Sequence, residues 1–203
     1  MTITVQQGFS ETQRTQVAEI YVAAFERKLM PLFKTSEIAI RLVSAELYPP
    51  CSLTAADETG RVLGVAGFQH GGKQLLNFSA SAMMREFGWF SGAIRYGAAV
   101  FFERTPDKRL LQLDGIAVHS EARGMGVGTQ MITALETFAI QHGYQGIRLD
   151  VVDTNPHARR LYERLGFGAQ RTIAVPFLRS LGFTAFTTMV KPVGTTIHNP
   201  HPA

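Results

Sequence analysis

The 203-residue chain is poor in cysteine, tryptophan and lysine, and it lacks several motifs of well-known chemistry. Its one cysteine, Cys51, allows no disulfide within the chain and excludes a structural zinc site built on cysteines. The six histidines form no HExxH or similar cluster, so we expect no metal site. A Gly-x-Ser-x-Gly motif is also absent, which leaves serine hydrolysis without support.

Long hydrophobic runs are missing as well. The most apolar stretch, from Phe87 to Phe102, is interrupted by Arg95. Each uncharged half is much shorter than the ~20 residues that cross a membrane. Residues 1–15 are polar and lack the apolar core of a signal peptide. We therefore expect a cytoplasmic protein without a membrane segment.

Neither sign of charge predominates. The chain has 20 Lys and Arg and 16 Asp and Glu, for a formal net charge of +4. A dedicated nucleic-acid-binding protein usually carries a dense basic face, so we expect no nucleic-acid partner. Within the basic set, 15 residues are arginine and 5 are lysine. The planar fork of arginine suits phosphate groups.

The order of apolar patterns and turn signals predicts an α/β fold. Strands are expected at 2–6, 51–57, 61–69, 109–118, 146–152, 168–177 and 183–191, and helices at 10–31, 36–47, after the glycine run 123–128 and after Asn155. The strand–loop–helix–strand–helix order from 109 to 166 requires a parallel strand pair, and the flanking hairpins make the sheet mixed. We expect one domain over residues 1–191, with a helical insertion at about 79–105, and a loose tail at 192–203.

A glycine-rich loop with the sequence Arg123-Gly124-Met125-Gly126-Val127-Gly128-Thr129 follows an apolar strand and begins a helix. The N-terminus of a helix offers unpaired amides and the positive end of its dipole, and glycine lets an anion approach the backbone. Arg123 adds a charged fork. This combination predicts a cradle for a phosphate or pyrophosphate group.

Three phosphate-binding loops compete for this segment. The Walker A loop is excluded, because no lysine precedes Thr129. The dinucleotide fingerprint is one residue too short, although Asp150 follows at about the right distance to bind a ribose. The third pattern, Arg/Gln-x-x-Gly-x-Gly/Ala, fits Arg123, Gly126 and Gly128.

This third pattern resembles the acetyl-CoA loop of the GNAT superfamily of N-acetyltransferases. The resemblance covers about 110–167: the strand Leu113-Asp114-Gly115-Ile116-Ala117-Val118, the loop, the strand 147–152, and the run Asn155-x-x-Ala158-x-x-x-Tyr162-x-x-x-Gly166-Phe167. One departure is Ser120, where family members often carry proline. The resemblance implies a mixed sheet of about six to seven strands, with a splayed parallel pair at its centre and helices on its flanks.

The resemblance also implies acetyl-CoA as co-substrate, bound between the strands that end at Val118 and Val152. Its pantetheine arm would pair with the main chain of Ile116, Ala117 and Val118, and its pyrophosphate would bind the amides of Gly124, Met125, Gly126, Val127, Gly128 and Thr129, with contacts from Arg123 and Asn155. A primary amine of a small molecule or a protein would attack the thioester directly. An amide near Val118 would stabilise the oxyanion.

Two residues are candidates for catalysis. The resemblance implies Tyr162 as the general acid, although a phenol (pKa ~10) protonates a thiolate (pKa ~8.5) unfavourably. Asp114 could bind the substrate ammonium or take its proton through water. Strand alternation turns Asp114 to the same side as Ile116 unless a bulge intervenes. Glu86, Glu103 and Asp150 are further candidates for the base.

The insertion at 79–105 is rich in aromatic residues, among them Phe87, Trp89 and Phe90. We expect helices whose aromatic face lines the acceptor pocket, or else completes the core or the seam of a homodimer. Two other functions remain open for the chain as a whole. These are a non-enzymatic acyl-CoA-binding module and a nucleotide-dependent oxidoreductase.

Overall fold

The computed structural model describes residues 2–30, 33, 35–91, 107–176, 179 and 182–194. Within them, seven strands form a mixed sheet in the order β1-β2-β3-β4-β5-β7-β6. The strands are β1 (Thr4–Gln7), β2 (Ser52–Ala56), β3 (Val62–Gln69), β4 (Leu110–Val118), β5 (Gly146–Val152), β6 (Gly168–Ala174) and β7 (Ala185–Pro192). The α-helices are α1 (Arg14–Ala24), α2 (Glu26–Leu29), α3 (Ser36–Glu46), α4 (Ala80–Phe87), α6 (Val127–Gln141) and α7 (Pro156–Arg164). The short 3-10 helices are η1 (Glu11–Gln13), η2 (Pro49–Cys51) and η3 (Ser120–Ala122).

Strands β4 and β5 are the parallel pair, and all the other neighbouring strands are antiparallel. The parallel register begins at Leu110 opposite Gly146 and ends at Leu113 opposite Leu149. Helix α6 is the crossover between the two strands, as the βαβα pattern predicted. The predicted mixed sheet with a central parallel pair is therefore confirmed.

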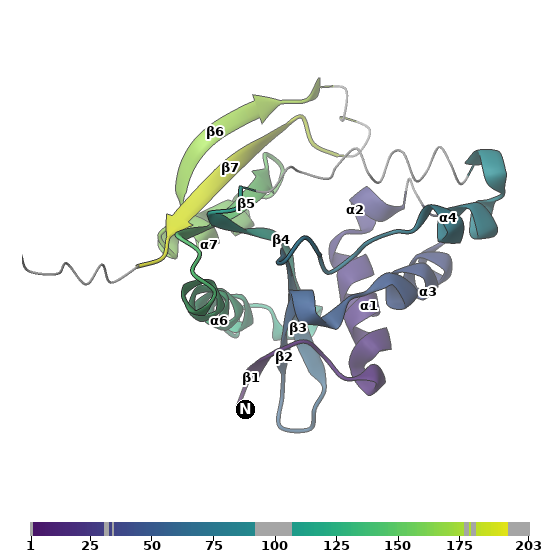
Figure 1. The fold of residues 1–203 in the computed structure, drawn as a ribbon, viewed down its shortest axis with the longest axis horizontal. Coiled ribbons are helices and arrows are strands. Elements are labelled where there is room, and N and C mark those ends of the chain that lie inside the picture. Colours follow the sequence, from purple (N-terminus) through teal and green to yellow (C-terminus); the bar gives the residue numbers. More distant parts are fainter. Residues whose placement is uncertain are drawn as a thin grey trace, which may run out of the picture.

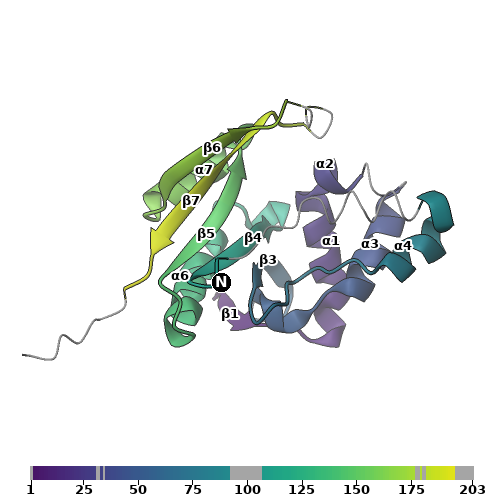
Figure 2. The same ribbon diagram turned by 45° about the horizontal axis from the view of Figure 1, so that its top comes forward.

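The helices divide between the two faces of the sheet (Figures 1 and 2). Helices α6 and α7 cover one face, here called the α6 face, and their core includes Met131, Leu135 and Tyr162. Helices α1 to α4 pack on the opposite face, here called the α1 face, around Val17, Val43 and Met83. Strand β4 contributes to both cores, with Leu111 and Leu113 on the α6 face and Ala117 on the α1 face.

The helix expected over residues 10–31 is divided in the structure. Ser10 begins it as a cap, and its amide donates to Oε1 of Gln13 over 3.1 Å. The first α-helix ends at Ala24, and Phe25 separates it from the one-turn helix α2. The ring of Phe25 packs on that of Tyr21, with their centroids 4.6 Å apart. The break therefore lies well before Pro31.

The first part of the insertion forms the expected helix. Helix α4 begins after Ser79, whose hydroxyl accepts from the amide of Ala82, and it buries Met83. Trp89 and Phe90 follow it and are 71% and 84% exposed. The remainder of the insertion, 92–105, lies outside the described residues. A role of the insertion in the acceptor pocket stays a prediction. The loose tail predicted at 192–203 does not begin at Pro192, because Pro192 ends β7 and Val193 is buried in the core; residues from 195 on are not described.

A helix that crosses a membrane must be long and apolar. Among the helices that the structure describes, none combines the length and the hydropathy of a membrane span.

Candidate active site

Strands β4 and β5 separate at the centre of the sheet. Their pairing stops at Leu113 and Leu149, while β4 continues to Val118 and β5 to Val152. Beyond this point β4 keeps its partner β3, and β5 keeps its partner β7. The two strands therefore form a V that opens toward their carboxyl ends (Figure 2).

The backbone of β4 directs polar groups into this V. The amide of His119 donates to the carbonyl of Leu63 over 2.8 Å, so this pair lies at a hydrogen-bonded position of the antiparallel ladder. Such positions alternate, which places the polar groups of Ala117 toward β3 and those of Ile116 and Val118 toward the V. Ile116 and Val118 thus offer the free strand edge that the predicted pantetheine contact needs. Ala117 does not, and its side chain is buried on the α1 face.

The backbone conformation requires glycine at two of the three glycine positions in the loop after β4. Gly124 has φ 79° and Gly126 has φ 80°, a left-handed region that side chains with a Cβ rarely adopt. Gly126 is also the N-cap of α6. Gly128 has an ordinary helical φ, and a Cβ there would lie 3.5 Å from Leu161. Gly124 and Gly126 therefore shape the loop, whereas Gly128 has room for alanine.

The loop presents a row of backbone amides. Gln130 is the first residue of α6 whose amide reaches back to a carbonyl, that of Gly126, over 3.0 Å. The amides of 127–129 precede that bond and point out of the helix N-terminus. The side chain of Val127 is buried, while those of Met125 and Thr129 are exposed. A Cβ at Gly124 or Gly126 would meet nothing within 4 Å, so the space above the loop is open.

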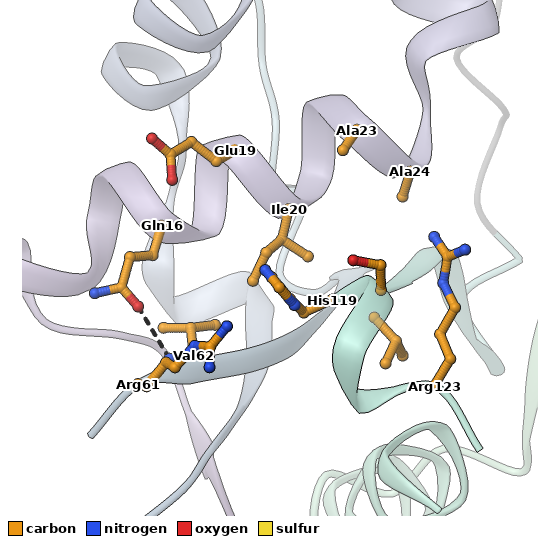
Figure 3. A pocket seen from close by; sticks show the side chains of 11 residues that line it. Gln16, Glu19, Ile20, Ala23, Ala24, Arg61, Val62, His119 and Arg123 are labelled. Atoms are coloured by element: carbon orange, nitrogen blue, oxygen red, sulfur yellow. Dashed lines mark hydrogen bonds between the residues drawn. The ribbon is translucent and has the colours of Figure 1, made fainter. Parts of the chain in front are cut away.

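Arg123 lies beside this row of amides and lines a cavity of about 520 Å³ between α1 and the end of β4 (Figure 3). Val118 and Ser120 line the same cavity, and Ile20 and Ala24 border it from α1. The Arg123 side chain is exposed, and it has no ion-pair partner in the part of the chain that the structure describes. Its guanidinium is thus available to an anion at the loop.

Asn155 begins α7, as its position before Pro156 predicted. Its Oδ1 accepts from the amide of Ala158 over 3.1 Å. The side chain is exposed, at the end of β5 that borders the V. Capping engages the oxygen and leaves the side-chain amide nitrogen for a ligand.

Tyr162 is 9% exposed and packs against Phe167, with ring centroids 5.7 Å apart. Among the described residues, its hydroxyl has no hydrogen-bond partner. Burial raises the pKa of Tyr162 to about 12, so the phenol is protonated at neutral pH. A buried tyrosine usually finds a partner for its O–H, so this hydroxyl is available to donate to a ligand or to water.

Asp114 lies at the apex of the V, on a β-bulge. Gly115 is opposite Gly67 and Leu113 is opposite Phe68, so Asp114 is the extra residue of β4. Nε2 of Gln69 donates to Oδ1 of Asp114 over 2.8 Å. The bulge therefore turns Asp114 toward the α1 face, away from Ile116. Simple alternation along the strand would have placed both side chains on one face.

Two aromatic residues of the first helical segment lie over this bulge. A Cβ at Gly115 would lie 2.4 Å from Cζ of Phe25, so glycine lets the ring rest directly on β4. Burial raises the pKa of the Tyr21 hydroxyl, and the nearby charge of Asp114 raises it further. Tyr21, Phe25 and Asp114 thus share one corner of the V. The helix period around residue 20 placed Tyr21 on an apolar face, but no sequence signal linked it to Asp114.

The other candidate carboxylates are engaged elsewhere or not described. Glu86 accepts from Arg41 over 2.6 Å, on α4. Asp150 accepts from the hydroxyl of Thr188 over 2.5 Å. Glu103 lies outside the described residues. Among the residues that are described, no group of three His, Cys, Asp or Glu could hold a metal ion.

The site as described fits acetyl-CoA in three independent ways. The edge of β4 at Ile116 and Val118 has no strand opposite it, as a pantetheine arm requires. The glycine loop offers amides and an uncommitted arginine to a pyrophosphate. The hydroxyl of Tyr162, on the helix that follows β5, has no partner within the described residues. Bound there, acetyl-CoA would supply an activated acetyl group.

Comparison with curated proteins gives partial relatives. The chain is 36% identical over 73 residues to the thialysine N-epsilon-acetyltransferases of Bos taurus and Mus musculus. The aligned part is 36% of this chain and 43% of each relative, so the chain spans less than half the length of these proteins.

Solved structures share the fold at low sequence identity. An N-acetyltransferase from Staphylococcus aureus superposes with a TM-score of 0.66 at 16% identity, covering 92% of this chain and 99% of the other. A GCN5-related N-acetyltransferase from Kribbella flavida gives a TM-score of 0.60 at 19% identity, covering 94% and 97%. The splayed strand pair therefore belongs to a known fold.

The family assignment rests on a longer match. Residues 14–167, which include α1, the V, the glycine loop and α7, match the family described as acetyltransferase (GNAT). The match covers more than half of the 203 residues. The chain belongs to the acetyltransferase (GNAT) family.

Proposed function

We propose that the chain is an acetyl-CoA-dependent N-acetyltransferase that acts on a primary amine. The observation that carries this proposal is the V itself: an unpaired edge of β4 that leads from Asp114 to the amides of the glycine loop. A thioester at the apex would be reached by an amine from the α1 face. The family assignment and the names of the partial relatives support the same reaction.

The reaction needs no covalent enzyme intermediate, because the thioester is already activated. The amine nitrogen forms a C–N bond with the acetyl carbon, the C–S bond breaks, and CoA leaves as a thiolate that takes up a proton. The proton lost by the amine passes to solvent. Ile116 and Val118 both direct their amides into the V, and Ile116 is the nearer of the two to the apex, so its amide can donate to the thioester oxygen as negative charge develops.

Tyr162 acts in this scheme by hydrogen bonding. Its pKa of about 12 exceeds that of a thiol by some three to four units, so full proton transfer to the thiolate is uphill by about 5 kcal/mol. A hydrogen bond from the phenol to the sulfur carries no such penalty. Tyr162 therefore stabilises the leaving group, and solvent completes the protonation.

Asp114 attracts the acceptor as an ammonium ion. An amine has a pKa near 10.4 and a carboxylic acid near 3.9, so direct proton transfer to Asp114 is strongly uphill. The carboxylate instead attracts and orients the ammonium at the apex, and the attacking species is the small neutral fraction of the amine, whose proton has passed to a base in the buffered solvent. Gln69 fixes the orientation of the carboxylate over 2.8 Å.

The test is a panel of amines incubated with acetyl-CoA, with release of free thiol as the readout. The partial relatives are named for the ε-nitrogen of thialysine, so lysine-like amines belong in the panel. Acetyl-CoA and CoA are expected to raise the melting temperature, and a ligand at a hundred times Kd stabilises by about 2.7 kcal/mol. Binding without turnover of any amine would favour a non-enzymatic acyl-CoA module. A rise in melting temperature with NAD, and none with CoA, would overturn the cofactor assignment.

A further inference from the structure

Strand β5 carries an arginine in the middle of an apolar segment. Arg148 stands between Ile147 and Leu149, whose side chains are buried on the α6 face. Its partner in the parallel register is Gln112, which is 6% exposed. Arg148 therefore projects on the α1 face, one position before the apex of the V.

Among the residues that the structure describes, the guanidinium of Arg148 has no hydrogen-bond or ion-pair partner. Its Nε is inaccessible to solvent and has no hydrogen-bond acceptor. Within the described residues, the side chain makes no hydrogen bond or ion pair. The charge of Arg148 contributes to the lowered pKa of Asp107, but only as the smallest of several causes, and Asp107 is bonded to Arg109.

Such an arrangement is unfavourable in the empty protein. An arginine remains charged at all physiological pH values, and a buried donor without an acceptor pays the full cost of its desolvation. Arg148 is half-buried, and the donor shut off from solvent is its Nε. Retaining Arg148 in an apolar strand therefore indicates an anionic group that arrives with a ligand.

Opposite charge lies close by on the same face. Asp114 is two positions beyond Gln112 along β4, and Asp150 is two positions beyond Arg148 along β5. In regular paired strands the Cα atoms at these two positions would be roughly 8 Å apart, and the separation of β4 from β5 beyond Leu113 makes room for a small molecule between them. One small molecule that bears both an ammonium and a carboxylate can bridge them.

We infer that the acceptor is an amine that also carries a carboxylate, such as an amino acid, and that Arg148 binds this carboxylate. This inference rests on the proposed acetyltransferase function. Arg148 and Asp114 then recognise the two ends of a zwitterion. The planar fork of arginine matches a carboxylate with two parallel hydrogen bonds, which lysine cannot reproduce.

The test compares L-amino acids with their carboxamides, which keep the amine and the side chain but lose the negative charge. Binding to the CoA-loaded enzyme is measured by calorimetry, and turnover by thiol release. We expect the free acid of the preferred acceptor to bind about ten to a hundred times more tightly than its carboxamide. In Arg148→Met and Arg148→Lys this preference should fall, while the KM for acetyl-CoA stays unchanged.

Thermal melting separates a binding role from a structural one. If Arg148 binds the acceptor, Arg148→Met should melt at the same temperature as the parent or higher, because it removes a buried donor that has no acceptor among the described residues. A loss of stability with an intact preference for free acids would overturn the inference. So would equal binding of acids and carboxamides by the parent protein. Selective binding of free acids without acetyl transfer would instead count against the proposed function and leave Arg148 as a carboxylate site.

Discussion

The two faces of the sheet contribute to the V in different ways. On the α6 face, the glycine loop, α6 and α7 come from one continuous stretch, and local backbone geometry creates the site. On the α1 face, Tyr21, Gln69 and Asp114 come from three separate elements and meet only in the folded protein, and Arg148 lies on the same face on a fourth element. The residues proposed to bind the cofactor therefore form a contiguous motif, whereas those proposed to recognise the acceptor are distant in sequence.

The largest expected effect is on the α6 face. Gly126→Asp should abolish acetyl-CoA binding, because it places a carboxylate where the pyrophosphate approaches and forces a Cβ into a left-handed conformation. Gly126→Ala should cost about 1–2 kcal/mol of stability from conformation alone. Calorimetry with CoA, together with melting, separates the two contributions.

Gly128→Ala is the matched control, because its Cβ meets only Leu161 at 3.5 Å. Alanine keeps the backbone amide of residue 128 and fits the available space, so CoA affinity and stability should stay within about 0.5 kcal/mol of the parent. Unchanged CoA affinity in a folded Gly126→Asp protein would remove the pyrophosphate from this loop.

Tyr162→Phe tests the hydroxyl that has no protein partner among the described residues. Phenylalanine keeps the packing against Phe167 and removes one hydrogen-bond donor. A hydrogen bond to a charged group contributes about 1.5–3 kcal/mol, so kcat should fall roughly ten- to a hundredfold. The Kd for acetyl-CoA should change little. An unaffected kcat would make Tyr162 a packing residue only.

Gly115→Ala probes the α1 face. The new Cβ would lie 2.4 Å from the ring of Phe25, so the ring must move. Overpacking of this kind costs about 1–3 kcal/mol and should lower the melting temperature by several degrees. The acceptor KM should rise more than the acetyl-CoA KM. Equal increases in the KM for the acceptor and the KM for acetyl-CoA would show that the α1 face does not act on the acceptor alone.

The smallest expected effect concerns neither ligand. His70 lies at the end of the sheet away from the glycine loop, with its Nδ1 2.9 Å from the hydroxyl of Tyr144. Burial, and to a lesser degree His142, lowers the pKa of His70 in the folded protein. The unfolded chain therefore binds this proton first, and the stability that neutral His70 contributes is lost as pH falls below about 6.5.

The measurement is the decrease in melting temperature between pH 7.5 and pH 5.5. It should be smaller in His70→Asn, which keeps a polar atom toward Tyr144 but does not titrate. Equal decreases in the parent and the variant would exclude His70 as the source of the pH dependence. Acetyl-CoA affinity should not differ between the two proteins at either pH.

The same contrast between the faces explains what the sequence could predict. The loop from Arg123 to Thr129 was recognisable because phosphate binding needs glycines and amides in consecutive positions. The parallel pair followed from the βαβα order. Asp114 was recognised as a candidate, but its direction depended on a bulge that only the register with β3 reveals. Arg148 was missed, although a lone arginine inside an apolar strand was a visible signal.

The ends of the first helix show another limit of prediction from the sequence. Apolar spacing and Pro31 predicted one helix over 10–31, but the α-helix ends at Ala24. The aromatic ring of Phe25 packs over Gly115, some ninety residues away in the sequence. This tertiary contact accompanies a break that local propensity did not indicate.

The short parallel seam between β4 and β5 also bears on how the chain folds. Strands β1 to β4 follow one another in sequence as antiparallel neighbours, and β5 to β7 form a second local group. Only four residue pairs join the two groups through backbone pairing, from Leu110 to Leu113. Contacts between distant parts of a chain form more slowly than local ones. The glycine loop and α6 are the link across this seam, so the segment proposed to hold the pyrophosphate is also the crossover that brings the two half-sheets together.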